Sequence, residues 1–141
     1  GGIKFALPDV VAKAKDLLAS SNGEDRCEII AGNVFEDVPE GGDAYLIKSV
    51  LMDESDEKAI SILRECRSVM APSARIIVIE HLLTQPNQPQ VNYSDMTMMI
   101  MTGGRERSKD EFAALFSASS FRPDHVVSTQ SPFTLLIGVP I

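Results

Sequence analysis

Residues 75–83, with the sequence RIIVIEHLL, form the strongest strand pattern in the chain. The β-branched residues from Ile76 to Ile79 follow one another without interruption, as is typical of a buried strand. Because no polar residues alternate with them, the run predicts a parallel strand that is covered on both faces. A strand of this kind is characteristic of α/β proteins.

Strands and helices alternate on either side of this segment. Pro8 suits the first turn of one helix, and Ser55 and Ser108 suit the N-caps of two others. The short link 130–132 predicts an antiparallel pair at the C-terminus. We therefore expect an α/β fold with a mostly parallel, doubly wound sheet and a C-terminal antiparallel hairpin. The expected strands are 3–6, 27–31, 44–50, 75–83, 123–129 and 132–139, and the expected helices are 8–18, 55–70, 93–101 and 109–119.

The composition predicts one globular domain over residues 1–141. Hydrophobic residues make up 44% of the chain and charged residues 23%, which allows a sizeable core. A net charge of −7 argues against binding to nucleic acid or to an anionic membrane surface. No apolar run reaches the length of a membrane span. Cys27 and Cys66 lack the spacing of a metal site, so we expect no metal, and two buried thiols favour the reducing cytoplasm.

The ends of the expected strands carry the candidate functional residues. In an open α/β sheet, ligands bind at the carboxyl ends of the strands, near the point where the strand order reverses. The residues to consider therefore lie directly after each strand, in the segments 6–9, 32–35, 49–54 and 80–83.

Five segments, most of them at these strand ends, occur in an order that is familiar from one enzyme family. They are FALPDVV (5–11), AGNVF (31–35), YLIKSVLMDE (45–54), IVIE (77–80) and GGRERS (103–108). Together they resemble the S-adenosylmethionine-dependent O-methyltransferases of small-molecule hydroxyls, of the plant caffeate and bacterial polyketide type. The resemblance implies a Rossmann-like sheet, S-adenosylmethionine as cofactor, a small hydroxyl acceptor and a homo-oligomer, expected to be a dimer.

The resemblance also implies where the cofactor would bind. The family's acidic residue for the ribose hydroxyls falls on Ala6, which cannot accept those hydrogen bonds. The family's adenine-binding turn corresponds to residues that include Asn33 and Val34, and its lysine corresponds to Lys48. The family's first strand, its glycine-rich cofactor loop and its N-terminal dimerisation domain have no counterpart in the sequence, so we expect a truncated methyltransferase-like domain.

A second departure concerns proton removal from the acceptor hydroxyl. The family's catalytic histidine falls on Met52, and a thioether cannot take up a proton at neutral pH. The family's supporting glutamates fall on Glu80 and Glu106, and either Glu80 or Asp53 could replace the missing base. A positioned general base contributes about 10²–10⁴ in rate. The resemblance therefore implies an impaired or inactive enzyme.

Each candidate also has a purely structural interpretation. Asp53 is as well suited to cap the helix that begins near Ser55, and Glu106 lies in a charged stretch that would ordinarily be solvated. His81 and His125 are expected at the surface or at a strand edge. In the family the segment with Met96 and Met99 lines the acceptor pocket; the alternatives are a core stripe or an exposed apolar face.

A non-catalytic function is the second hypothesis. A chain without the family's first strand could bind small molecules or self-assemble, since apolar surface left without a partner favours association. On this hypothesis the strand at 3–6 pairs directly with the strand at 44–49, or the chain oligomerises.

Overall fold

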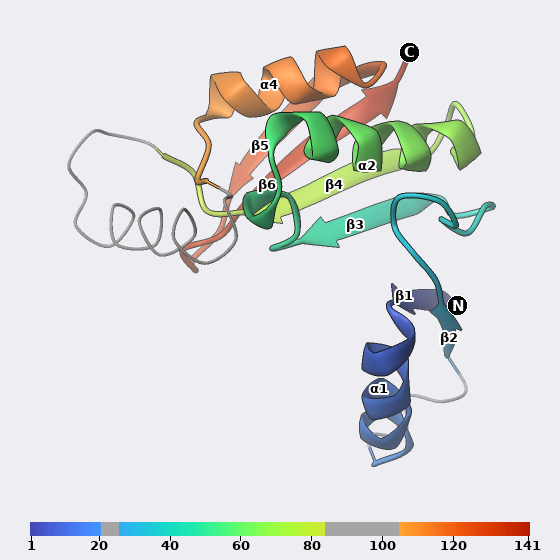
Figure 1. The fold of residues 1–141 in the computed structure, drawn as a ribbon. Helices are drawn as coiled ribbons and strands as arrows, with labels where there is room; N and C mark the ends of the chain where they lie inside the picture. Colours follow the sequence, from blue (N-terminus) through green and yellow to red (C-terminus); the bar gives the residue numbers. More distant parts are fainter. Residues whose placement is uncertain (21–25, 84–104) are drawn as a thin grey trace. The chain divides into compact units, whose positions relative to one another are not determined.

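The computed structural model describes residues 1–20, 26–83 and 105–141. The chain folds into two compact units, Gly1–Glu40 and Gly41–Ile141, and each is described by itself (Figure 1). The single domain expected over 1–141 stays a prediction, and the helix expected at 93–101 lies outside the described residues. Within the described segments, every helix is too short or too polar to span a bilayer.

The first unit is a strand–helix–strand element. Strand β1 (Gly2–Ala6) leads into helix α1 (Pro8–Ser20), and strand β2 (Cys27–Ala31) then pairs with β1 in parallel. The helix begins at Pro8, as predicted, because the first helical turn does not need the amide hydrogen that proline lacks. Both predicted strands are therefore confirmed. A pairing of β1 with the strand at 44–49 would join the two units, and it stays a prediction.

Gly32 follows β2 directly and holds the ends of the two strands of the first unit. Its amide donates a hydrogen bond to the carbonyl of Ala6 at 3.0 Å, which ties the two strand ends together. A Cβ atom at Gly32 would lie only 2.5 Å from a ring carbon of Phe5. Any larger residue would therefore displace that ring, which accounts for the glycine.

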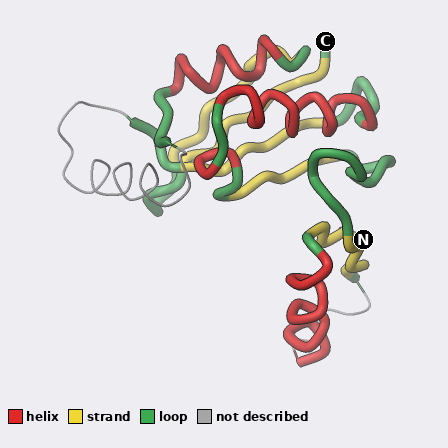
Figure 2. The backbone as a smooth tube through the Cα atoms, viewed as in Figure 1, coloured by secondary structure: helices red, strands yellow, loops and turns green. Residues whose placement is uncertain are grey.

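The second unit is built on a four-stranded sheet with the order β3-β4-β6-β5. Its strands are β3 (Ala44–Lys48), β4 (Arg75–Glu80), β5 (Phe121–Ser128) and β6 (Thr134–Pro140). Strand β3 pairs with β4 in parallel, and β6 is antiparallel to both β4 and β5, so that only β6 runs against the other strands of this sheet. Figure 2 shows the sheet in yellow. The predicted C-terminal hairpin is confirmed.

Two helices lie side by side on one face of this sheet (Figure 1). Helix α2 (Asp56–Val69) begins at the N-cap Ser55, and helix α4 (Lys109–Ala118) begins at the N-cap Ser108, as the sequence predicts. Each presents an apolar stripe to the sheet. The buried residues of these stripes are Ala59, Ile62, Leu63 and Cys66 of α2, and Phe112, Leu115 and Phe116 of α4.

Strand β4 differs from the prediction made for residues 75–83. It ends at Glu80, and it pairs in parallel with β3 on one side but antiparallel with β6 on the other. Its burial alternates: Ile76 and Val78 are buried, whereas Ile77 and Ile79 are only half-buried. The prediction of a purely parallel strand is therefore wrong, because β6 is antiparallel to β4. Within the second unit, α2 and α4 both pack on the same face of the sheet, so that cover on both faces stays a prediction.

Element boundaries differ from the predictions by a few residues. Strand β3 ends at Lys48 instead of residue 50, strand β5 begins at Phe121 instead of residue 123, and strand β6 begins at Thr134 instead of residue 132. The expectation of two buried thiols is half right, since Cys66 is buried and Cys27 is half-buried, and both are free. Burial raises the pKa of Cys66 to about 12, so this thiol stays protonated.

Candidate active site

The chain turns sharply where β3 ends. Ser49 has a φ of 54°, a left-handed conformation that is uncommon for residues other than glycine. Its amide still bonds the carbonyl of Ile79 at 3.2 Å, which anchors the turn to the neighbouring strand. A short 3-10 helix, η1 (Leu51–Asp53), follows at once. We refer to residues 49–54 as the η1 turn. This turn lies at the carboxyl end of the parallel strands, where open α/β sheets bind their ligands.

Glu80 holds the beginning of the η1 turn. One carboxylate oxygen, Oε1, accepts hydrogen bonds from the amides of Val50 at 3.2 Å and Leu51 at 3.1 Å. The side chain is only 1% exposed. Its second oxygen, Oε2, is buried and has no hydrogen-bond partner among the described residues. Glu80 thus satisfies amides that the start of a helix leaves without partners.

The pKa of Glu80 is raised from 4.5 to about 7. Burial is the main cause, because removal from water disfavours the charged carboxylate. The amides of Met52, Val50 and Leu51 oppose the shift, and the nearby carboxylate of Glu106 adds to it. Glu80 therefore changes its protonation state near neutral pH.

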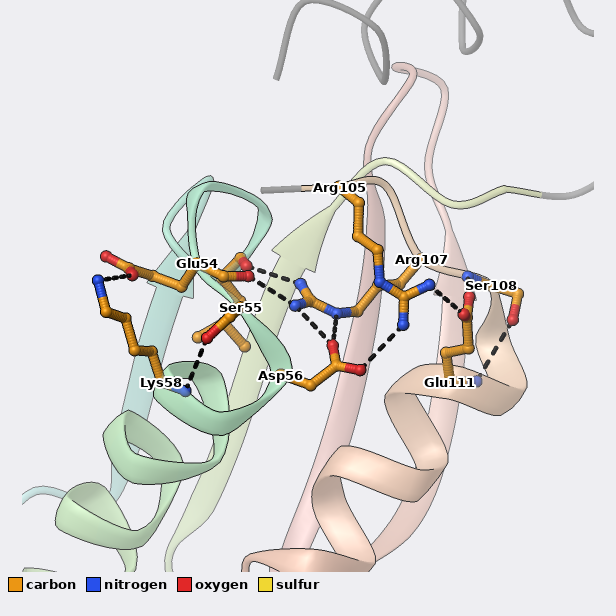
Figure 3. Close-up of polar contacts among 9 residues, drawn as sticks. Glu54, Ser55, Asp56, Lys58, Arg105, Arg107, Ser108 and Glu111 are labelled. Atoms are coloured by element: carbon orange, nitrogen blue, oxygen red, sulfur yellow. Dashed lines mark hydrogen bonds and ion pairs between the residues drawn. The ribbon is translucent and has the colours of Figure 1, made fainter. Parts of the chain in front are cut away.

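Arg107 holds the other end of the η1 turn (Figure 3). Its guanidinium donates to the carbonyl of Leu51 at 2.6 Å, to the carbonyl of Glu54 at 2.7 Å and to the carboxylate of Asp56 at 2.9 Å. The residue is 1% exposed. A carboxylate thus meets the amide end of the η1 turn and a guanidinium meets its carbonyl end, which matches the direction of the backbone dipole.

Arg105 extends this network to α4. It donates to Asp56 at 2.9 Å and also to Glu111, whose carboxylate accepts from the amide of Ser108 in a capping box (Figure 3). Partial burial acts to raise the pKa of Asp56, but the hydrogen bonds from Arg107 and Arg105 outweigh it and hold that pKa below its ordinary value. The start of α2 and the start of α4 are therefore joined by paired charges.

Glu106 lies between these two arginines in the sequence but has a different environment. It is 2% exposed, and one of its carboxylate oxygens lies 3.6 Å from Nδ1 of His81. The expectation that Glu106 belongs to a solvated charged stretch is therefore wrong. Of residues 105–107 only Arg105 is exposed, because Glu106 and Arg107 are buried within the second unit.

His81 and Lys48 meet through Phe133. The imidazole ring of His81 lies against the Phe133 ring with centroids 4.4 Å apart, and the Lys48 ammonium sits 4.2 Å from the centroid of the same ring. The His81 side chain is 31% exposed. His81 is therefore packed on one side rather than free at a strand edge, whereas His125 is an exposed surface histidine, as expected.

Met52 and Asp53 both lie in η1 and are half-buried. Asp53 does not cap α2, because the hydroxyl of Ser55 accepts the amide of Lys58 in that role. The second unit thus brings together the η1 turn, Glu80 and Glu106 at one end of the sheet. Whether Asp53, Glu80 or Glu106 takes part in catalysis stays a prediction.

The residues expected to bind the cofactor fall in both units. In the first unit, Ala6 ends β1, Val34 is half-buried, and the Oδ1 atom of Asn33 accepts the amide of Phe35 at 3.1 Å. That oxygen is therefore already engaged by the backbone. Lys48 belongs to the second unit, so that a shared cofactor site stays a prediction. Met96 and Met99, expected in the acceptor pocket, lie outside the described residues.

Sequence reasoning missed the role of Arg107. A buried arginine and a solvated one look alike in a charged stretch, and its partners Leu51 and Glu54 are more than fifty positions away along the chain. No local pattern signals such a contact. Among the described residues, no group of three or more histidine, cysteine or acidic side chains could hold a metal ion.

Comparison with known proteins gives a consistent result. Residues 1–122 match the family profile described as an O-methyltransferase domain. A curated relative, the mitomycin biosynthesis 6-O-methyltransferase of Streptomyces lavendulae, is 40% identical over 121 residues, which is 86% of this chain and 35% of the relative. The chain therefore spans little more than a third of that protein.

Solved structures agree in fold. The mitomycin 7-O-methyltransferase MmcR superposes with a TM-score of 0.96 at 34% identity, over 99% of this chain and 42% of that one. The calicheamicin biosynthesis methyltransferase CalO1, in its SAH-bound form, superposes with a TM-score of 0.83 at 32% identity, over 99% of this chain and 41% of that one. The expected Rossmann-like α/β fold is confirmed. The chain belongs to the O-methyltransferase domain family.

Proposed function

We propose that the protein containing this chain transfers a methyl group from S-adenosylmethionine to a hydroxyl of a small molecule. The observation that carries the proposal is the η1 turn, which Glu80 and Arg107 hold at the carboxyl ends of β3 and β4. The family membership and the SAH-bound state of the CalO1 structure support the choice of donor. We further propose that Asn33, Val34 and Lys48 contact that donor, and that Met96 and Met99 contact the acceptor.

Methyl transfer requires a group that removes the acceptor proton, and the η1 turn lacks the histidine that the family resemblance implies for this task. Methyl transfer is an in-line displacement, in which the acceptor oxygen attacks the methyl carbon, the electrons of the C–S bond return to sulfur, and the hydroxyl proton must leave. Met52 occupies the half-buried position in η1 where the family resemblance implies a histidine. We propose that transfer is impaired unless another side chain takes up this proton, because a positioned general base contributes about 10²–10⁴ in rate.

The unpartnered oxygen of Glu80 supports this proposal. Among the described residues Oε2 has no donor, although it is buried beside the amides of η1. A histidine at position 52 would bring an N–H group to this region, whereas methionine brings none. A buried acceptor without a donor costs about 1–3 kcal/mol, so a histidine donor at position 52 would relieve this cost.

The alternative is a non-catalytic module that binds small molecules or self-assembles. One observation favours it: large apolar side chains are exposed in both units, with Leu46 of β3 63% exposed and Leu7 58% exposed. Apolar surface of this kind marks interaction sites when it is contiguous. The proposal of a homo-oligomer, a dimer, rests on the same side chains. A cytoplasmic location is also proposed, on the two free cysteines.

Calorimetric titration of the intact protein with S-adenosylmethionine and with S-adenosylhomocysteine tests the proposed function. We expect saturable heat from both ligands and a higher melting temperature when either is bound. The variant Lys48→Met should weaken this binding, whereas Lys109→Met, at the exposed start of α4, should not. No heat and no change in melting temperature at millimolar ligand would favour the non-catalytic alternative.

A further inference from the structure

His81 and Glu106 form a pair at the carboxyl end of β4 that the family resemblance does not assign. Nδ1 of His81 lies 3.6 Å from a carboxylate oxygen of Glu106, and the carboxylate is almost fully buried while the histidine is 31% exposed. A carboxylate that faces Nδ1 leaves Nε2 of the imidazole to accept a proton. This arrangement suits a side chain that takes up a proton during a reaction.

We propose that His81 is the general base for the acceptor hydroxyl, in place of the histidine that Met52 replaces. The inference rests on the proposed function. As the acceptor oxygen attacks the methyl carbon, its proton passes to Nε2 of His81, and the electrons of the C–S bond return to the donor sulfur. The imidazolium so formed faces Glu106 through Nδ1 and then releases its proton to solvent.

The packing of the ring supports this assignment. Phe133 covers one side of the imidazole at a centroid distance of 4.4 Å, and Glu106 lies beside Nδ1. With Nδ1 carrying the ring hydrogen, Nε2 holds the free lone pair, and no hydrogen bond within the described residues engages it. Two neighbours thus fix the ring while the proton-accepting edge stays available.

His81 lies at the same end of the sheet as the η1 turn. His81 follows β4 directly, and the last residue of that strand, Glu80, pairs with Thr134 at the start of β6. The Lys48 ammonium at the end of β3 lies over the same Phe133 ring as the imidazole. Ligands of open α/β sheets bind at this end.

The other candidate bases are less suitable. Glu80 is 1% exposed, and its Oε1 atom is engaged by the amides of Val50 and Leu51, so that it holds the backbone instead of facing an acceptor. Asp53 is half-buried within η1, and no described side chain pairs with it to stabilise the proton that it would accept. Of these residues only His81 combines exposure with a buried carboxylate partner.

The test compares His81→Asn with the wild-type protein in its intact form. Methyl transfer is followed with tritium-labelled S-adenosylmethionine and a panel of caffeate, 4-hydroxybenzoate and 1-naphthol, and the dissociation constant of the donor is measured separately. We expect kcat to fall by about 10²–10⁴ while donor affinity stays within about twofold. His125→Asn is the matched control, since that histidine is exposed on β5, and it should keep wild-type kcat.

A second variant gives an independent readout. Introducing Met52→His into the His81→Asn protein places a new imidazole in the η1 turn. The double variant should have a kcat at least tenfold higher than that of His81→Asn. Wild-type kcat in His81→Asn would overturn the assignment, as would loss of donor binding in that variant. Wild-type protein that binds no donor would instead overturn the proposed function. Donor binding without methylation of any of the phenols would overturn the hydroxyl acceptor class and the assignment of His81 with it.

Discussion

At the scale of single residues, two buried charged side chains of the second unit bind opposite ends of the η1 turn. Glu80 accepts from the amides at the start of the η1 turn, and Arg107 donates to the carbonyls at its end. Each is about 1% exposed, so neither can exchange its protein partners for water. The consequence is a turn whose backbone depends on two side chains that are distant in sequence.

Glu80 should make the stability of the protein depend on pH. Its pKa is about 7 in the folded protein and ordinarily 4.5, so the folded state binds this proton more tightly. The stabilising contribution is complete below about pH 4.5 and is lost as pH rises through about 7. Relative to Glu80→Gln, we expect the wild type to lose on the order of 3 kcal/mol of unfolding free energy over that window.

Urea unfolding of both proteins at pH 4.5 and pH 8 measures this difference. Glutamine keeps an acceptor oxygen for the amides of the η1 turn, so the variant should fold. Glu57→Gln, at an exposed position of α2, serves as the control and should follow the wild type at both pH values. Parallel pH profiles for the wild type and Glu80→Gln would contradict the assigned proton affinity of Glu80.

Arg107 should contribute far more to stability than Arg105. Arg107→Met removes a buried guanidinium and leaves the carbonyls of Leu51 and Glu54 without donors, at a cost of about 3–5 kcal/mol. Arg105→Met removes exposed ion pairs with Asp56 and Glu111 and should cost at most about 1 kcal/mol. Thermal unfolding of the two variants compares them, and equal costs would show that burial does not decide the effect.

At the scale of helices and strands, local signals were sufficient wherever the chain itself supplies the partners. Ser55 and Ser108 were predicted as N-caps and are found in that role, because a cap bonds an amide only three residues away. The hairpin of β5 and β6 was predicted from its short link for a similar reason. The η1 helix was not predicted, since Glu80 and Leu51 meet across 29 positions of sequence.

The capping box at the start of α4 allows a test at this scale. Ser108→Ala removes the hydroxyl that accepts the amide of Glu111 and should cost about 1 kcal/mol. Ser117→Ala, in the exposed last turn of the same helix, should change stability by less than about 0.5 kcal/mol. Chemical denaturation of both variants decides the point; indistinguishable midpoints would mean that the start of α4 is held by its ion pairs alone.

At the scale of the whole molecule, burial is distributed unequally between the two units. Among the described residues, the buried apolar core lies in the second unit except for Val11 of α1. The sequence did not reveal this, since the apolar patterns of 3–6 and 27–31 resemble those of the other strands. The antiparallel pairing of β4 with β6 was not predicted for a related reason, because a run of apolar residues does not show in which direction the neighbouring strands run.

Hydrogen exchange should therefore separate the two units of the 1–141 chain. We expect the amides of β1 and β2 to exchange faster than those of β4 and β6, because fewer buried apolar contacts oppose local opening. Mass spectrometry of peptides from each unit measures the rates. Equal protection across both units would show that they unfold together.

Residue 52 offers a final consequence of the way in which the η1 turn is held. The turn takes its shape from Glu80, Arg107 and the left-handed Ser49, none of which depends on the side chain at position 52. Substitutions at position 52 should therefore leave the backbone of the turn intact. Most variants in a saturation library at this position should fold like the wild type and differ from it in the rate of methyl transfer. In evolutionary terms, such a site can lose a reactive group and later acquire another without the fold being rebuilt.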